Sequence, residues 1–189
     1  SGAHETQMHW QLRSLNERVG LFAQNGNVVY RDGGQTILWK EELTIQQQAT
    51  ILTHISRLRD AYQFPQYDTV EIRGAQISLS LVGHHADYEI KKNFDPMGKR
   101  RKVLLDIVPL ESDDIEIAIG GTTCFDYFPK GKNKGFNIKR YMKGSDISEC
   151  HYVGDQLFPQ GNDASVIGVC PYTNVSDPEE TKEHIRRYL

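Results

Sequence analysis

The sequence predicts an α/β fold into which a separate α+β unit is inserted, and two observations lead to this prediction. Apolar residues recur at helical spacing in several segments, and β-rich runs that alternate in period two lie between them. From residue 36 to 125 these patterns follow the order α-β-β-α-β-β, whereas the flanks read α-β and α-β-β-α. We therefore expect an inserted domain at 36–125 between two halves of one α/β domain, 1–35 and 126–189.

Composition sets the class of protein. Of 189 residues, 38% are hydrophobic and 25% are charged, which is ordinary for a soluble globular chain. The net charge of -3 provides no general attraction to nucleic acid or to an anionic membrane, and no apolar run approaches the roughly 20 residues of a membrane span. Cys124, Cys150 and Cys170 are widely spaced, which fits a reducing compartment. We expect a cytoplasmic protein whose partner is a small molecule.

The first segment predicts a helix followed by a hairpin. Residues 4–15 carry apolar side chains at helical spacing, and two β-rich runs, Val19–Ala23 and Val28–Tyr30, flank Asn25-Gly26. Asn-Gly between such runs is a strong signal for a tight turn. The chain opens on a helix with no strand before it, so we expect the first strand of the parallel sheet to lie upstream.

The middle segment predicts helices that alternate with strand pairs. A helix from Thr44 to about Gln63 has a threonine N-cap and apolar residues at steps of three and four. The runs at 69–74 and 76–83 alternate as a hairpin, and 87–105 is charged and helix-prone. Two further strands are predicted at 115–121 and 122–129.

The last segment predicts a short helix at 134–142, strands at 150–154 and 165–169, and a closing helix at 177–189. The basic run 98–102 is typical of a solvated helix face.

An acidic loop follows the predicted strand at 150–154. Asp155, Asn162 and Asp163 lie on this glycine-containing loop, at the strand end where open α/β sheets bind ligands. Their oxygens suit Mg²⁺, which takes one or two carboxylates and keeps water or phosphate oxygens as its other ligands. The same residues also favour ordinary turns, and spacing alone leaves both interpretations open.

Two further positions suit a phosphoryl group. Lys134 begins a predicted helix after a lysine-rich loop, and a lysine is a point charge for phosphate, although such loops are usually only solvated. Ser1 opens the first predicted helix, where a hydroxyl and backbone amides can bind an anion. A Ser-Gly start is also common without any such role.

Taken in order, these segments resemble the haloacid-dehalogenase (HAD) superfamily. Its phosphotransferases have a nucleophilic aspartate motif, a Ser/Thr motif, a lysine before a helix and an acidic loop of the GDxxxxxGND kind. Here the last three occur in order, and 154–163 reads GDQLFPQGND. The resemblance implies a HAD-like Rossmannoid core, incomplete without its first strand, that carries an inserted α+β cap.

The middle of the chain narrows the resemblance to the eukaryotic-type phosphomannomutases. The hairpin 71–84, EIRGAQISLSLVGH, is similar to that family's substrate hairpin, and 124–134, CFDYFPKGKNK, resembles its SFDVFPEGWDK segment. In that family three cap arginines, a serine and an aspartate hold the substrate's distal phosphate. The corresponding residues in this chain are Arg73, His84, Lys91, Cys124 and Asp126.

The resemblance also implies roles and a cofactor. Asp155 and Asp163 would bind Mg²⁺, Lys134 and Ser1 would contact the transferring phosphoryl, and Asn162 would contact the substrate. The partner would be a sugar phosphate, and related mutases suggest a homodimer formed through the cap.

No DxDxT nucleophile motif occurs in the sequence. We therefore expect the nucleophile to lie upstream in a longer protein, and this chain by itself to lack phosphotransferase activity. Three functions remain open: a phosphomannomutase-like isomerase that interconverts mannose 6-phosphate and mannose 1-phosphate through an aspartyl-phosphate, a sugar-phosphate phosphatase, and an inactive binding module. Arg73 and Asp126 favour the mutase, whereas His84, Lys91 and Cys124 favour the phosphatase.

Overall fold

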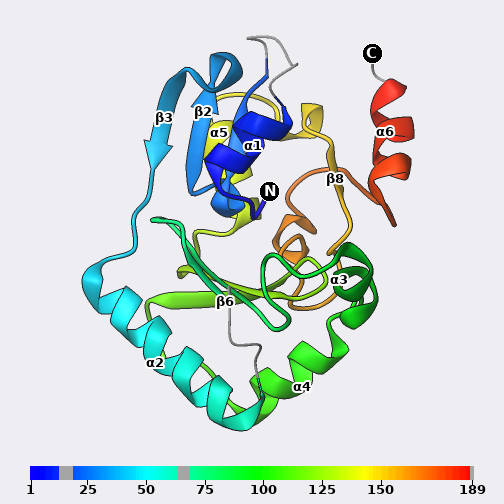
Figure 1. Ribbon diagram of the computed structural model, residues 1–189. Helices are drawn as coiled ribbons and strands as arrows, with labels where there is room; N and C mark the ends of the chain where they lie inside the picture. Colours follow the sequence, from blue (N-terminus) through cyan, green and yellow to red (C-terminus); the bar gives the residue numbers. More distant parts are fainter. Residues whose placement is uncertain (13–18, 64–68, 188–189) are drawn as a thin grey trace.

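The structure is a computed structural model that describes residues 1–12, 19–63 and 69–187. Its elements form two parts that face each other (Figure 1). We call one part the cap; it contains strands β4 to β7 and helices α2 to α4. The other part, here called the core, contains the remaining elements of both chain ends. Helices and sheets occur in both parts, so the expected mixed α/β class is observed.

The cap is an antiparallel four-stranded sheet in the order β4-β5-β7-β6, with α2 and α4 along one face and α3 beside its end (Figure 1). Its strands are β4 (Val70–Ile72), β5 (Ile77–Ser80), β6 (Ile115–Gly120) and β7 (Cys124–Pro129), and its helices are α2 (Ile45–Ala61), α3 (Tyr88–Phe94) and α4 (Lys99–Ile107). The predicted helix at 87–105 is thus two helices. Thr44 caps α2 as predicted and forms a capping box with Gln47.

Alternation along the strands separates the two faces of the cap sheet. Leu79 and Phe125 belong to the buried cluster that also contains Ile55 of α2 and Leu105 of α4. The neighbouring positions on these strands therefore point to the opposite face, and they are Ser78, Ser80, Cys124 and Asp126. The register places Ser78 opposite Asp126 and Ser80 opposite Cys124. One face of the sheet is thus a hydrophobic core, and the other presents small and polar side chains.

The N-terminal part of the core is a three-stranded antiparallel sheet beside α1 (Glu5–Gln11). It contains β1 (Leu21–Ala23), β2 (Val28–Arg31) and β3 (Thr36–Lys40). The Asn25-Gly26 turn is confirmed, with positive φ at both residues. Residues 13–15 of the predicted first helix lie outside the described residues.

The first predicted domain boundary lies at the start of a strand, and the second lies inside one. β3 pairs with β2, although the boundary at residue 36 would assign β3 to the inserted domain. Likewise, β7 runs across the second boundary at 125/126. The division into domains stays a prediction.

The C-terminal part contains α5 (Lys134–Tyr141), β8 (Tyr152–Gly154), β9 (Tyr172–Asn174) and α6 (Pro178–Arg186). β8 and β9 pair in parallel. The predicted strand at 165–169 is wrong, because 164–166 form a 3₁₀ turn and the amide of Val169 bonds the carbonyl of Val166. This segment packs against α5, where Ser165 accepts a hydrogen bond from the Gly135 amide, so it is not free to join the sheet.

The acidic loop is attached to the cap by its backbone. The Ile119 amide donates to the carbonyl of Gln160 (2.8 Å), and the Asn162 amide donates to the carbonyl of Ile119 (2.9 Å). Phe158 on the same loop packs against the buried cluster of the cap. The loop therefore bridges the two parts. Among the described residues, no helix is long and apolar enough to cross a membrane.

Candidate functional site

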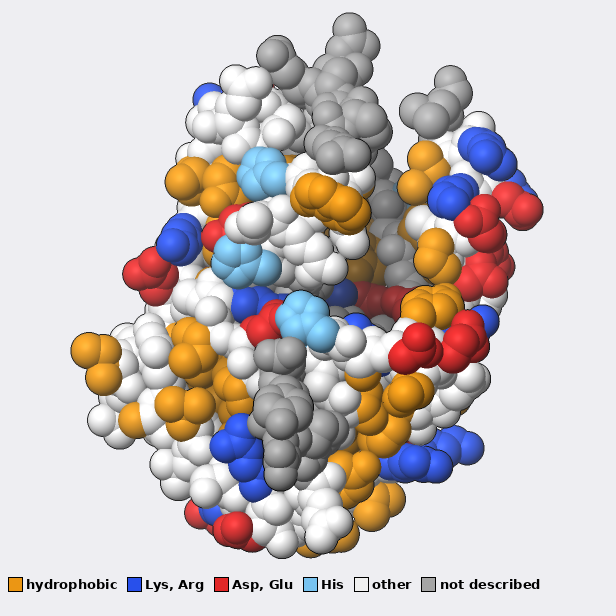
Figure 2. All heavy atoms as spheres, viewed as in Figure 1, with side chains coloured by type: hydrophobic (Ala, Val, Ile, Leu, Met, Phe, Trp, Pro, Cys, Tyr) orange, Lys and Arg blue, Asp and Glu red, His pale blue; other side chains and the backbone are white. Residues whose placement is uncertain are grey.

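A cleft of about 850 Å³ lies between the cap and the core. Figure 2 shows the hollow between the two parts, with both basic and acidic side chains around it. All ten residues that the sequence nominated line this cleft: Ser1, Arg73, His84, Lys91, Cys124, Asp126, Lys134, Asp155, Asn162 and Asp163. The fold thus brings together segments that are up to 162 residues apart in sequence, from Ser1 to Asp163.

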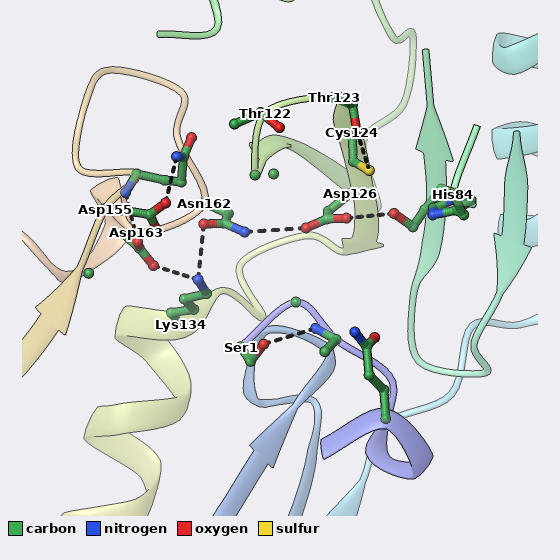
Figure 3. Close-up of a pocket in the computed structure, with 18 of the residues that line it drawn as sticks. Ser1, His84, Thr122, Thr123, Cys124, Asp126, Lys134, Asp155, Asn162 and Asp163 are labelled. Atoms are coloured by element: carbon green, nitrogen blue, oxygen red, sulfur yellow. Dashed lines mark hydrogen bonds and ion pairs between the residues drawn. The ribbon is translucent and has the colours of Figure 1, made fainter. Parts of the chain in front are cut away.

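Lys134 lies at the start of α5, as predicted, and its position is fixed by the acidic loop. Asn133 caps the helix by accepting a hydrogen bond from the Phe136 amide. The Nζ of Lys134 donates to Oδ1 of Asn162 (2.9 Å) and to Oδ1 of Asp163 (2.5 Å) (Figure 3). Lys134 has three N–H donors, so one remains to contact a ligand in the cleft.

Asp163 is a buried carboxylate that accepts hydrogen bonds at both oxygens. Besides Lys134, Oδ1 accepts from the Tyr152 hydroxyl (2.5 Å), while Oδ2 accepts from the Gln156 amide (2.9 Å). Burial by itself would raise the pKa of Asp163, but the charge of Lys134 and these hydrogen bonds together lower it. Asp163 is therefore an anion that orients Lys134 and fixes the loop.

Asp155 differs from Asp163 in being exposed at the cleft. The side-chain amide of Gln156 donates to one of its oxygens (3.0 Å), which leaves the other oxygen accessible. Among the described residues, no group of three or more His, Cys, Asp or Glu side chains could hold a metal ion. The donor set fits Mg²⁺ with one direct carboxylate, because this ion binds proteins through one or two carboxylates and completes its shell with water or phosphate oxygens.

A chain of hydrogen bonds links the core side of the cleft to the cap. The side-chain amide of Asn162 donates from Nδ2 to Oδ2 of Asp126 (3.3 Å), and the Ser78 hydroxyl donates to Oδ1 of Asp126 (2.9 Å) (Figure 3). Asn25 makes a third, longer contact with Asp126 (3.4 Å). Asp126 is 3% exposed, so it is a fixed part of the wall rather than a mobile group.

Glu71 is a charged site residue that sequence reasoning did not nominate. Its Oε2 accepts from both Nε (2.9 Å) and Nη2 (2.5 Å) of Arg73. Its Oε1 lies 3.5 Å from Nδ1 of His84. Burial would raise the pKa of Glu71, but the hydrogen bond and charge of Arg73 lower it. The signal was available, because Glu71 and Arg73 share one face of an alternating strand.

His84 and Lys91 both line the cleft, but their environments differ from the expectation for a phosphate site. Burial lowers the pKa of His84, and the nearby charges of Arg73 and Lys91 lower it further against the opposing effect of Glu71. The ring is therefore neutral at neutral pH. Lys91 donates from Nζ to the backbone oxygen of His84 (2.9 Å). Burial raises the pKa of the Cys124 thiol, which keeps this side chain neutral.

Ser1 lines the cleft but does not open a helix. Its Oγ accepts a hydrogen bond from the Ala3 amide (3.1 Å), and α1 starts at Glu5 with His4 as its N-cap. The expectation that Ser1 opens the first helix is therefore wrong; the residues before the helix are tied to the β1–β2 connection, where the Gln24 amide donates to the Ala3 carbonyl and the Asn25 amide donates to the Ser1 carbonyl.

The basic run 98–102 was predicted to be a solvated helix face, but Arg101 within it is buried. Its side chain is 0% exposed and pairs with Asp95 (3.0 Å). It also donates to the carbonyls of Gly120, Gly121 and Cys124. Arg101 thus holds the β6–β7 turn that carries Thr122 and Thr123 at the rim of the cleft.

Known proteins are similar to this chain in sequence. A phosphomannomutase of Spinacia oleracea is 26% identical over 181 residues, covering 88% of this chain and 71% of that protein. One of Schizosaccharomyces pombe is 28% identical over 179 residues, covering 88% of this chain and 68% of that protein.

Two solved structures have a similar fold at 13% identity. A HAD-like hydrolase of B. subtilis matches with a TM-score of 0.62 over all of this chain and 86% of that chain. A sucrose-phosphatase of Synechocystis, solved with sucrose and phosphate, matches with a TM-score of 0.56 over 98% of this chain and 72% of that chain. At this identity, these two likenesses support the HAD-like fold alone.

The eukaryotic phosphomannomutase family model matches residues 2–189, nearly the whole chain. Together with the HAD-like fold and the arrangement of Lys134 and the acidic loop, this match establishes that the chain belongs to the eukaryotic phosphomannomutase family of the HAD superfamily.

Proposed function

We propose that this chain forms most of an Mg²⁺-dependent phosphoryl-transfer site for hexose phosphates. Membership of a phosphotransferase family gives the reaction class. The observation that carries the proposal is the Lys134–Asn162–Asp163 cluster, which lies beside the accessible Asp155 and opposite a polar cap wall in one cleft. A cleft with charged groups at one end and hydrogen-bonding groups at the other suits a small phosphorylated sugar.

Each residue of the core side has a role that follows from its contacts. Lys134 directs its remaining N–H at a phosphoryl oxygen, and Asp163 keeps the ammonium in place. Asp155 would hold Mg²⁺ directly and Asp163 through water, and the ion would supply positive charge beside the phosphoryl group. Without a cation this end of the cleft has one positive and two negative side chains, so we expect phosphate binding to require Mg²⁺.

We infer that none of the three described aspartates that line the cleft is the nucleophile. Asp155 and Asp163 belong to the proposed metal loop, and Asp126 is enclosed by Ser78, Asn25 and Asn162. We therefore propose that this chain binds the sugar phosphate but does not turn it over by itself. Mg²⁺-dependent turnover by the chain alone would contradict this part of the proposal.

Two reactions remain candidates for the complete site. The first is interconversion of mannose 6-phosphate and mannose 1-phosphate, which is supported by the similarity to phosphomannomutases. Hydrolysis of a sugar phosphate is favoured by the pairing of Arg73 with Glu71, because a hydrolase needs no second phosphate site. We further propose a cytoplasmic location and a homodimer formed through the cap.

The test is direct binding of sugar phosphates to this chain. Isothermal titration calorimetry would measure mannose 6-phosphate, mannose 1-phosphate and glucose 6-phosphate, each with Mg²⁺ and with EDTA. We expect binding of at least one sugar phosphate with Mg²⁺, and binding at least about tenfold weaker with EDTA. Failure of all three to bind with Mg²⁺ would reject the proposed function and favour a role outside sugar-phosphate chemistry.

A further inference from the structure

We propose that Gln156 sets the cation preference of the acidic loop, because it holds Asp155 so that a single carboxylate oxygen is offered to a divalent ion. The small Mg²⁺ ion suits one oxygen from a carboxylate, whereas the larger Ca²⁺ ion also takes both oxygens at once. The inference rests on the proposed function, in which Asp155 is the metal ligand. It assigns Gln156 as a positioning residue that favours the smaller ion.

The side chain of Gln156 occupies one oxygen of Asp155. Its Nε2 donates to Oδ2 of Asp155 (3.0 Å), which leaves Oδ1 for a ligand in the cleft. The N–H group also places partial positive charge beside Oδ2. This charge opposes a cation that approaches both oxygens together, so the contact favours binding through Oδ1 alone.

The backbone of Gln156 is fixed by Asp163. The amide of Gln156 donates to Oδ2 of Asp163 (2.9 Å), and the amide of Asp163 donates to the carbonyl of Gln156 (3.2 Å). A Cβ on Gly161 would lie 2.1 Å from that carbonyl oxygen, so the loop closes this tightly only with glycine there. Gln156 is 4% exposed, which leaves its side chain little room for another rotamer. The fold therefore builds the contact between Gln156 and Asp155.

The other polar atom of the Gln156 side chain indicates that the contact does not serve stability. Its Oε1 is buried and has no hydrogen-bond partner among the described residues. A buried acceptor without a partner costs folding free energy. Asp155 is exposed, so water would solvate its carboxylate without the amide of Gln156. An apolar side chain of the same length would serve the fold at least as well, and the contact is explained by its effect on Asp155.

The experiment replaces Gln156 by an apolar side chain of similar length. Gln156→Met removes both polar atoms and releases Oδ2 of Asp155. Mn²⁺ serves as the probe, because it takes the same kind of oxygen ligands as Mg²⁺. Electron paramagnetic resonance would measure free Mn²⁺ while Mg²⁺ or Ca²⁺ displaces it from the chain. We expect the ratio of the Ca²⁺ to the Mg²⁺ dissociation constant to fall at least about fivefold relative to the unaltered chain.

A second measurement separates positioning from a structural role. Urea unfolding in EDTA should find Gln156→Met at least as stable as the unaltered chain, because the variant loses a buried acceptor that has no partner. Gln160→Met is the matched control, since Gln160 is exposed on the same loop and is not among the residues that line the cleft. We expect it to leave the ratio of dissociation constants unchanged.

The outcomes are distinct. An unchanged ratio in Gln156→Met overturns the inference. A loss of stability in EDTA also overturns it, because the side chain would then serve the fold. Failure of the unaltered chain to bind Mn²⁺ would reject the metal site of the proposed function, and the inference with it.

Discussion

Lys134 and Asp163 form a buried ion pair between the first residue of α5 and the acidic loop, with 2.5 Å between Nζ and Oδ1. The two residues are 8% and 2% exposed. Each therefore depends on the other for the stability of its charge, and the pair fixes the distance between the helix start and the loop.

Removing the lysine should destabilise the fold. Lys134→Met leaves Asp163 buried without its cation, which costs about 3–5 kcal/mol for a broken buried pair. Urea unfolding followed by circular dichroism would measure the loss. The control is Lys139→Met, on the exposed side of the same helix, which should change the free energy of unfolding by less than about 0.5 kcal/mol. The double variant with Asp163→Asn should recover part of the loss, and no recovery would contradict the pairing argument.

Asp155 should contribute to ion binding without contributing to stability. Because its carboxylate is exposed, Asp155→Asn should leave the unfolding free energy unchanged within about 0.5 kcal/mol. In the same variant, the increase in thermal midpoint that Mg²⁺ and a sugar phosphate give the unaltered chain should largely disappear. Asp113→Asn, an exposed carboxylate away from the cleft, is the matched control. An unchanged Mg²⁺ response in Asp155→Asn would exclude this residue as the metal ligand.

Arg101 should be among the most sensitive positions in the cap. Arg101→Met removes the partner of the buried Asp95 and the donors to three backbone carbonyls of the β6–β7 turn, so we expect a loss of about 3–5 kcal/mol. The control is Lys99→Met, two residues away and exposed, for which we expect a near-neutral effect. Thermal or urea unfolding would measure both. Equal effects of the two substitutions would mean that Arg101 is solvated after all.

Stability should decrease on mild acidification. Burial lowers the pKa of both His54 and His84 below the ordinary value of 6.5, so the unfolded chain takes up protons that the folded chain resists. Their contribution is complete above pH 6.5 and is lost as the pH falls through the lowered values. The urea concentration at the unfolding midpoint should therefore decrease from pH 7.5 to pH 6.5 and again to pH 5.5. In His54→Asn the fall should be shallower, even though the variant is less stable at pH 7.5. A midpoint that rises as the pH falls would refute the assignment.

Local pattern in the sequence was sufficient for most individual elements. The Thr44 cap, the Asn25-Gly26 turn and the helix at Lys134 follow from contacts within a few residues, which the sequence encodes directly. Resemblance to a family was sufficient to nominate ten residues that line the cleft. It did not predict the hydrogen-bond and ion-pair partners of each residue. The strand predicted at 165–169 failed because apolar residues suit both a strand and a packed turn, and only the contact with α5 decides between them.

Only the tertiary structure decided what the site residues can do. The charge state of His84 depends on its burial, the availability of Arg73 depends on where Glu71 points, and the role of Arg101 depends on a turn about 20 residues away in sequence. The sequence determines which charged groups exist and which strand face they occupy. Whether a charge is free to bind a ligand depends on partners brought close by long-range packing, and the strength of each interaction depends on the solvent that this packing excludes.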